Sequence, residues 1–275
     1  MKPRRAVPPP SAQKGATLVE LMVGLAIGLM VVAVALGALL VSRGVSGTVG
    51  DASQLQQQAA HALRVIGTQV RQAGSVRLNL AFGKPGEGSE QGVEALDSVA
   101  FETSFDRTQD TLGRDASHPL RVGYQNYKEQ LHGQEQAQSL LRDCLGRQPS
   151  DLAIQSSFRL NRPSGAVSGE LECAGADGRT EAVIGNVADF QVRYLLQGLD
   201  ASGNAVVRRV DAAGVNGEWP SVVAVDVCLE LVGDEPLDTA SATYRDCNDA
   251  ETGMGNRLRL VFRNTFQLRA QGAPR

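Results

Sequence analysis

The feature that most constrains this chain is an uncharged apolar run near its N-terminus. From Leu21 to Val41 there are 21 residues without a charged side chain. As a helix, this run is about 32 Å long at about 1.5 Å per residue, which is enough to cross the hydrocarbon layer of a bilayer. The sequence therefore predicts one transmembrane helix.

Charged residues flank this run unequally. The ionisable residues of the first fifteen are all basic (Lys2, Arg4, Arg5 and Lys14), and Arg43 is the first basic residue after the run. The positive-inside rule then places the N-terminus in the cytoplasm and the larger part of the chain on the other side of the membrane.

Without those four N-terminal residues the chain has 23 basic and 30 acidic side chains. This acidic balance argues against a nucleic-acid-binding protein.

Four cysteines follow the apolar run, and none belongs to a Cys-x-x-Cys pair: Cys144, Cys173, Cys228 and Cys247. Spacings this wide suit two disulfides in an oxidising compartment better than a zinc site. We expect Cys144 to pair with Cys173 and Cys228 with Cys247, because sequence-near pairing encloses two compact loops. The alternative, four unpaired buried thiols in a cytosolic domain, conflicts with the transmembrane run.

A basic, proline-rich leader precedes the apolar run, and the single carboxylate of Glu20 stands directly before it. A secretory signal has a shorter apolar core, of about 7 to 15 residues, and its cleavage site comes after that core. Here the candidate processing point is Gly15, in front of the helix. An uncleaved signal anchor is the alternative that composition alone favours.

The stretch KGATLVELMVGLAIGLMVVAVAL, starting at Lys14, resembles the class III leader and N-terminal helix of type IV prepilins. Four features of that family coincide: a basic leader, glycine at −1 (Gly15), glutamate at +5 (Glu20) and an uncharged run. The chain departs from the family at Ala16, which is usually phenylalanine. It also departs at Gly37, where major pilins often carry a helix-kinking proline.

This resemblance implies a processing step and a set of partners. Prepilin peptidase would cut after Gly15 and methylate Ala16, and Glu20 would act in assembly. The other implied partners are the major pilin, other minor pilins, the inner-membrane assembly platform and membrane lipid before assembly. The implied location is the bacterial inner membrane, single-pass with a periplasmic head, and then the pilus at the cell surface.

After the apolar run, Gly44, Gly47 and Gly50 predict a soft or bent joint, because each glycine weakens a helix by about 1 kcal/mol relative to alanine. We expect the helix to resume at residues 51–53 and to end with Gly74 as its C-cap. Apolar residues then recur at helical spacing and predict a stripe that can cover a sheet: Leu55, Ala59, Ala62, Ile66 and Val70.

Four later segments alternate apolar and polar residues, which is typical of an antiparallel sheet with one buried face. They are residues 98–105, 190–196, 221–232 and 256–270. Trp219 is expected to be a core or strand-start residue, and residues 83–92 and 108–123 are expected to be polar loops. The apolar positions that we expect on buried faces are Val99, Phe101, Thr103 and Phe105; Phe190, Val192, Tyr194 and Leu196; Val223, Val225, Val227, Leu229 and Leu231; and Leu258, Leu260 and Phe262. Asp226, Cys228 and Glu230 are expected on the opposite face, as are Arg257, Arg259 and Arg263, for which we favour a solvated face.

These patterns predict an α+β fold, with a long N-terminal helix, half in the membrane and half amphipathic, packed on an antiparallel β-sheet head. This arrangement is type IV pilin-like. The order of a strand, an acidic turn, a tryptophan and a valine-rich strand within residues 185–232 resembles the PilW family of minor pilins. The expected divisions are a leader (residues 1–15), a transmembrane and assembly helix (16–50) and a periplasmic head (51–275).

The function that this resemblance implies is that of a minor type IV pilin. Such a subunit is built into pili and helps to initiate their assembly, in support of adhesion and twitching motility. The alternatives are a minor pseudopilin of a type II secretion system and a membrane-tethered adhesin or binding protein.

The remaining residues offer little chemistry. The three histidines, His61, His118 and His132, lie in no metal-ligand spacing, and no nucleophile, phosphate-loop or dinucleotide motif is present. We therefore expect no enzyme activity and no cofactor. Residues 200–211 partly match a calcium-binding loop, with Ala205 where glycine is required. A hairpin turn explains the same residues without a metal, and we favour it.

Overall fold

The computed structural model describes residues 15, 17–80, 99–115, 117–130, 132–133, 136–237 and 241–269. The chain divides into two compact units, residues 1–49 and residues 50–275. Helix α1, Leu18–Gln72, contributes to both units. The second unit contains the sheet, and below we call it the head.

The backbone of α1 is helical without interruption from residue 18 to residue 72, so the interruption that we expected between Gly44 and Gly50 is wrong. Glycine weakens a helix but keeps its backbone N–H, so each of these residues can still make the i→i−4 hydrogen bond that a proline would remove. Three separated glycines are not enough to end the helix. The expected restart at residues 51–53 therefore does not exist either.

The head is built on an antiparallel sheet, and its strands follow the helix in sequence. Eight strands form the main sheet, in the order β14-β11-β9-β8-β7-β4-β3 with β10 paired to β9. Three separate two-stranded ribbons join β1 to β2, β5 to β6 and β12 to β13. The elements are β1 (Arg77–Leu80), β2 (Val99–Glu102), β3 (Leu112–Gly113), β4 (Leu120–Gln125), β5 (Lys128–Glu129), β6 (Gln138–Ser139), β7 (Ala153–Asn161), β8 (Gly169–Ala174), β9 (Thr180–Leu199), β10 (Ala205–Val210), the short 3-10 helix η1 (Trp219–Ser221), β11 (Val222–Pro236), β12 (Thr243–Arg245), β13 (Glu251–Gly253) and β14 (Arg257–Gln267).

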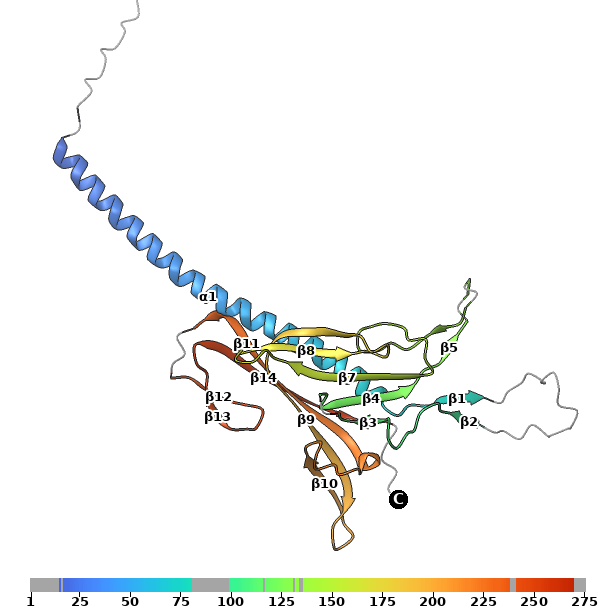
Figure 1. Ribbon diagram of the computed structural model, residues 1–275. Coiled ribbons are helices and arrows are strands. Elements are labelled where there is room, and N and C mark those ends of the chain that lie inside the picture. Colours follow the sequence, from blue (N-terminus) through green and yellow to red (C-terminus); the bar gives the residue numbers. More distant parts are fainter. Residues whose placement is uncertain are drawn as a thin grey trace, which may run out of the picture. The chain divides into compact units, whose positions relative to one another are not determined.

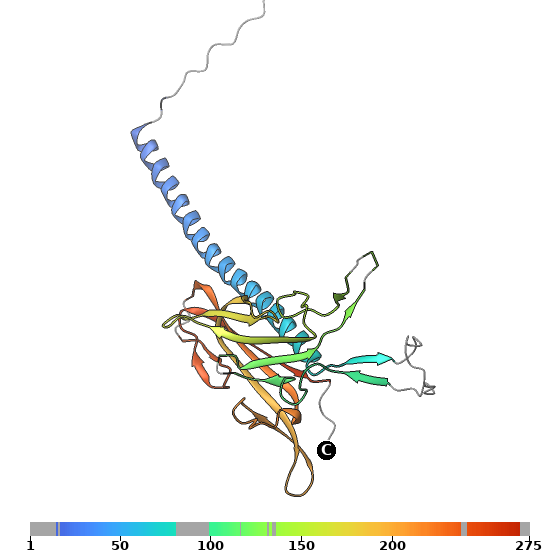
Figure 2. The ribbon, with the colours of Figure 1, turned by 45° about the vertical axis from the view of Figure 1, so that its right-hand side comes forward.

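The C-terminal part of α1 packs on one face of this sheet, as Figures 1 and 2 show for the head. The predicted apolar stripe is the packing surface, because each of its members is at most 1% exposed. Its residues belong to one core with side chains from β4, β7, β9, β11 and β14. Removing this apolar surface from water is the main force that holds helix and sheet together. The five stripe residues are Leu55, Ala59, Ala62, Ile66 and Val70.

The helix ends where the sequence predicts. Its last helical residue is Gln72, and Gly74 has a φ of 68°, a left-handed conformation that glycine adopts without steric cost. The N–H of Gly74 donates to the carbonyl of Gly123 on β4 (2.9 Å). The helix terminus is therefore fastened to β4 at its C-cap residue.

The predicted strand faces are confirmed in β9 and, with one exception, in β11, whereas Leu258, Leu260 and Phe262 of β14 are only half-buried. All four apolar residues expected on the buried face of β9 are buried, and the last four expected on β11 are too. Val223 is the exception, because a register shift between Val222 and Ala224 places Val222 in the core instead. The segment 98–105 is a strand only over Val99–Glu102, and the chain then turns at residues 103–106.

Two central strands, β7 and β8, are not identified in the sequence analysis. Along β7 the core positions are Ile154, Ser156 and Phe158, and the buried serine interrupts the apolar alternation. Residues 108–123 were expected to be a polar loop, yet they contain β3 and the start of β4, with buried Leu112 and Leu120. The other expected loop, residues 83–92, lies outside the described residues.

Candidate functional site

The candidate processing and assembly site is the start of α1. Gly15 is exposed, Ala16 lies outside the described residues, and the helix begins at Leu18. The first helical hydrogen bond runs from the N–H of Leu21 to the carbonyl of Thr17 (3.1 Å). Thr17 is therefore the N-cap residue, and Glu20 is the third residue of the helix.

Thr17 and Glu20 bond to each other reciprocally. The N–H of Glu20 donates to Oγ1 of Thr17 (3.3 Å), and the N–H of Thr17 donates to Oε2 of Glu20 (3.4 Å). This is a capping box, which satisfies two backbone donors that the helix leaves free at its N-terminus. The carboxylate also lies at the positive end of the helix dipole, where a negative charge is favourable.

Thr17 is the residue of this site that the sequence analysis missed. The signal was present, because Thr17-Leu-Val-Glu20 has the Ser/Thr-x-x-Glu spacing of a capping box directly before an apolar run. The structure thus gives Glu20 a role within its own chain. The predicted roles of Gly15 and Ala16 in processing and of Glu20 in assembly stay predictions.

The helix that follows presents an apolar surface. Residues Leu18–Leu39 are long and apolar enough to cross a membrane, and none of that window is buried within the chain. Met30 and Val34 are both 74% exposed. An apolar surface this long and continuous marks a segment that contacts lipid or other apolar helices.

Two disulfides stabilise the head, with the expected pairing. Cys144 on the loop after β6 is joined to Cys173 on β8, with 6.4 Å between the Cα atoms. Cys228 on β11 is joined to Cys247, which lies between β12 and β13, with 5.8 Å between the Cα atoms. The second bridge fastens the β12–β13 ribbon to the sheet.

The arginines expected to be solvated, Arg257, Arg259 and Arg263, instead bind groups of this chain. Nη1 of Arg259 lies 2.6 Å from Oε1 of Glu230, a carboxylate whose side chain is only 6% exposed. The hydroxyl of Tyr244 donates to the same oxygen (2.7 Å). Burial, together with the nearby carboxylate of Glu230, raises the pKa of Tyr244 to about 12. These bonds fasten the polar face of the sheet to the β12–β13 ribbon.

A buried polar cluster joins α1 to the sheet. The hydroxyl of Tyr124 donates to Oε1 of Gln69 (2.8 Å), and Oγ of Ser156 donates to the same oxygen (3.0 Å). Nε2 of Gln69 donates to the carbonyl of Arg142 (3.3 Å). Buried polar groups that satisfy one another specify a unique packing, so this cluster sets how the helix sits on β4 and β7.

The candidate calcium loop is a hairpin turn between β9 and β10. Oδ1 of Asp200 accepts the N–H groups of Ser202 (2.8 Å) and Asn204 (2.9 Å). Asp211 follows the six-residue strand β10, so it lies roughly 20 Å from the turn at about 3.3 Å per residue. Among the described residues, no group of three or more His, Cys, Asp or Glu side chains is placed to hold a metal ion.

Comparison with known proteins agrees with the N-terminal site. Residues 10–41 match the prokaryotic N-terminal methylation motif. Among solved structures, the chain is similar to a type IV-like pilin from Thermus thermophilus, at 12% identity and a TM-score of 0.37, over 78% of this chain and 95% of that one. No curated protein sequence matches the chain.

Proposed function

We propose that this chain is a minor type IV pilin of the PilW kind, stored in the inner membrane and then built into a pilus. One observation carries the proposal: the N-terminal methylation motif covers residues 10–41, and this range includes the exposed apolar helix segment Leu18–Leu39. The separate disulfide-bonded head is consistent with a subunit whose helix assembles and whose head lies outside.

In this proposal prepilin peptidase cuts after Gly15 and methylates the new N-terminus at Ala16. The new amine stays protonated near neutral pH and is the cation that processing creates at the level of Glu20. In the bilayer, Glu20 lies near the cytoplasmic edge and keeps its hydration. In a filament core it is buried, so it needs a cationic partner, and the amine of an adjoining subunit supplies it. This pairing sets the axial register between neighbours.

The head lies in the periplasm before assembly and at the cell surface afterwards. Its partners are the peptidase, the major pilin, other minor pilins and the inner-membrane assembly platform. A PilW-like subunit helps to initiate the pilus near its tip. The chemistry of processing belongs to the peptidase, for which this chain is a substrate.

The test combines the mature N-terminus with the location of the protein. Mass spectrometry of the native protein should find a methylated N-terminus at Ala16, and sheared filaments should contain it. Deletion should abolish surface pili and twitching. Loss of exoprotein secretion with normal pili would instead identify a type II pseudopilin. A retained leader and absence from filaments would identify a membrane-tethered binding protein and refute the proposal.

A further inference from the structure

Strand β14 forms one edge of the main sheet, and no described strand pairs with its outer side. The N–H of Leu268 donates to Val223 of β11, and the register pairs Gln267 with Ala224. Hydrogen-bonding direction alternates along an antiparallel strand, so every second residue bonds to β11, as Leu268 does. The backbone N–H and C=O groups of Thr265 and Gln267 therefore point away from β11. The end of β14 therefore offers a ladder of backbone donors and acceptors to another strand.

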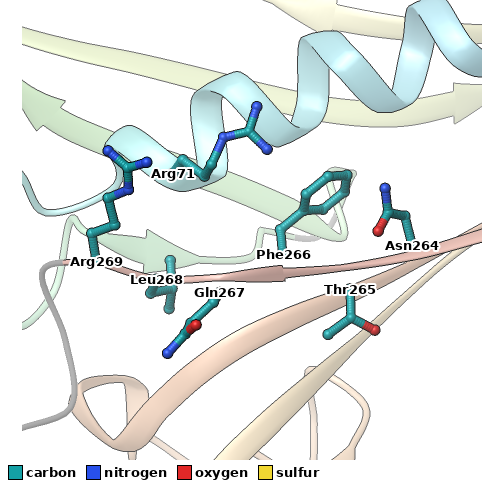
Figure 3. A pocket seen from close by; sticks show the side chains of 7 residues that line it. All are labelled: Arg71, Asn264, Thr265, Phe266, Gln267, Leu268 and Arg269. Carbon is teal, nitrogen blue, oxygen red and sulfur yellow. The ribbon is translucent and has the colours of Figure 1, made fainter.

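A groove of about 550 Å³ runs along this end of β14, beside the last turns of α1. Phe266 lies at its base, 5% exposed, with the guanidinium carbon of Arg71 5.9 Å from its ring centroid. Figure 3 shows Arg71 and Arg269 on the helix side of β14, whereas Thr265 and Gln267 point to the other side. Two cationic side chains thus lie on the helix side of the end of β14 and line this groove.

These two arginines differ from three arginines on strands β10 and β14. Arg209, Arg259 and Arg263 each pair with a carboxylate. Within the described ranges of the chain, neither Arg71 nor Arg269 has a carboxylate oxygen within 4.0 Å. A partner that supplies carboxylates at this place would complement both charges.

We propose that the outer edge of β14 accepts an extended, carboxylate-bearing segment of a different pilin-type subunit, by strand addition. Backbone pairing with Thr265 and Gln267 would supply affinity, and contacts of alternate side chains with Arg71 and Arg269 would supply selectivity. Natural proteins usually block exposed sheet edges with proline, bulges or covering elements. Residues 264–267 contain no proline, and their pairing with β11 has no bulge. That the partner is a pilin-type subunit rests on the proposed function.

The test is site-specific photocrosslinking of the full-length protein in cells that make pili. A photoreactive benzoylphenylalanine replaces Asn264, which is exposed and lines the groove. The crosslinked peptide is identified by mass spectrometry. Two added substitutions probe the two interactions: Gln267→Pro removes an outward N–H without touching the bonds to β11, and Arg71→Glu reverses a groove charge.

Each substitution has a matched control. The control for Gln267→Pro is Val207→Pro on β10, which is also an edge strand. The N–H of Asp200 donates to the carbonyl of Asn204, and the register pairs Ala205 with Leu199. Because hydrogen-bonding direction alternates along the strand, the N–H of Val207 points away from β9, and proline removes it. Arg64→Glu makes the same charge change two turns earlier on α1, at an exposed residue that does not line the groove.

We expect a crosslink to an acidic peptide of another pilin-type subunit. Its yield should fall about fivefold with Gln267→Pro or Arg71→Glu and stay unchanged with either control. The proposal is overturned if the yield is insensitive to both groove variants. A crosslink to this chain's own residues, to a second copy of it or to a basic segment would overturn it as well. Loss of the protein from filaments with the crosslink retained would refute the proposed function alone.

Discussion

Gly67 of α1 lies against the ring of Phe266 of β14, and replacing this glycine with alanine tests how closely helix and strand pack. An added Cβ would lie 2.4 Å from Cε1 and 2.8 Å from Cδ1 of Phe266, whereas ordinary contacts are 3.4–4 Å. The ring of Phe266 is buried and Arg71 lies over it, so it has little room to move. The helix or the strand must therefore shift by about 1 Å, which is the overpacking situation.

The expected magnitude is the difference between two opposing effects. In a helix interior, alanine is favoured over glycine by about 0.5–1 kcal/mol. Overpacking a well-filled core costs about 1–3 kcal/mol. We expect Gly67→Ala to destabilise the head by about 1–2 kcal/mol, which for a domain of this size lowers the melting temperature by about 2–8 °C.

The only tryptophan of the chain provides the assay. Trp219 packs edge-on against Tyr194 in the head, with the ring centroids 5.1 Å apart, so its fluorescence reports head unfolding in the full-length protein in detergent. Gly50→Ala is the matched control, because its added Cβ meets no atom within 4 Å and should stabilise slightly. Phe266→Leu should reduce the cost of Gly67→Ala, as expected for residues in contact. If Gly67→Ala were as stable as Gly50→Ala, the close approach would be refuted.

Four further outcomes are expected. Glu20→Ala should be processed normally, as measured by mass spectrometry of the N-terminus, but should be reduced in sheared pili. Thr17→Ala should weaken the first turn of α1 by about 1 kcal/mol while keeping the charge, so its leader removal and its abundance in sheared pili should stay close to those of the unchanged protein. Replacing Cys228 and Cys247 together by serine should lower the melting temperature by about 6–12 °C, from about 3 kcal/mol of lost stabilisation, and an unchanged Trp fluorescence transition would contradict this. Burial alone would raise the pKa of Glu172, but hydrogen bonds from β7 outweigh this effect, and the pKa is lowered overall. The stability that this carboxylate contributes is therefore present above its unfolded pKa of about 4.3 and is lost as pH falls through the lower folded value. Glu172→Gln should therefore make acid unfolding shallower, as measured by Trp fluorescence against pH.

The parts of the fold that the sequence predicted are those where one periodicity extends over a single packing surface. The stripe from Leu55 to Val70 was predictable because one helix face contacts one sheet face throughout. The alternation in β9 and β11 was predictable for the same reason, except at Val223, where a bulge changes the register. A bulge depends on the partner strand, so the pattern of one strand alone does not reveal it.

Other features depended on contacts that local sequence does not carry. Ser156 reads as a break in a strand, yet it is buried because it bonds to Gln69, 87 residues away. Arg259 reads as a solvent-exposed residue, yet it pairs with buried Glu230 on the neighbouring strand. In both cases the residue's role is set by a partner distant in sequence. The open edge of β14 is likewise visible only once the sheet order is known, as are the two arginines beside it that have no carboxylate partner among the described residues.

The start of α1 joins these two kinds of information, since its spacing is local while its proposed role is between subunits. The bond from the N–H of Thr17 to Glu20 is long, at 3.4 Å, and links an uncharged donor to an exposed carboxylate. A hydrogen bond from a protonated amine to a carboxylate is roughly twice as strong as one between neutral groups, and burial strengthens it further. The capping box can therefore hold Glu20 at the helix terminus before assembly without competing with the amine of a neighbour. Thr17→Ala removes the cap but keeps the carboxylate, so it should weaken the first turn and have little effect on incorporation into filaments. Glu20→Ala removes the carboxylate, so its main effect should be on incorporation. If Thr17→Ala and Glu20→Ala reduced incorporation into filaments equally, Glu20 would act only by stabilising its own helix.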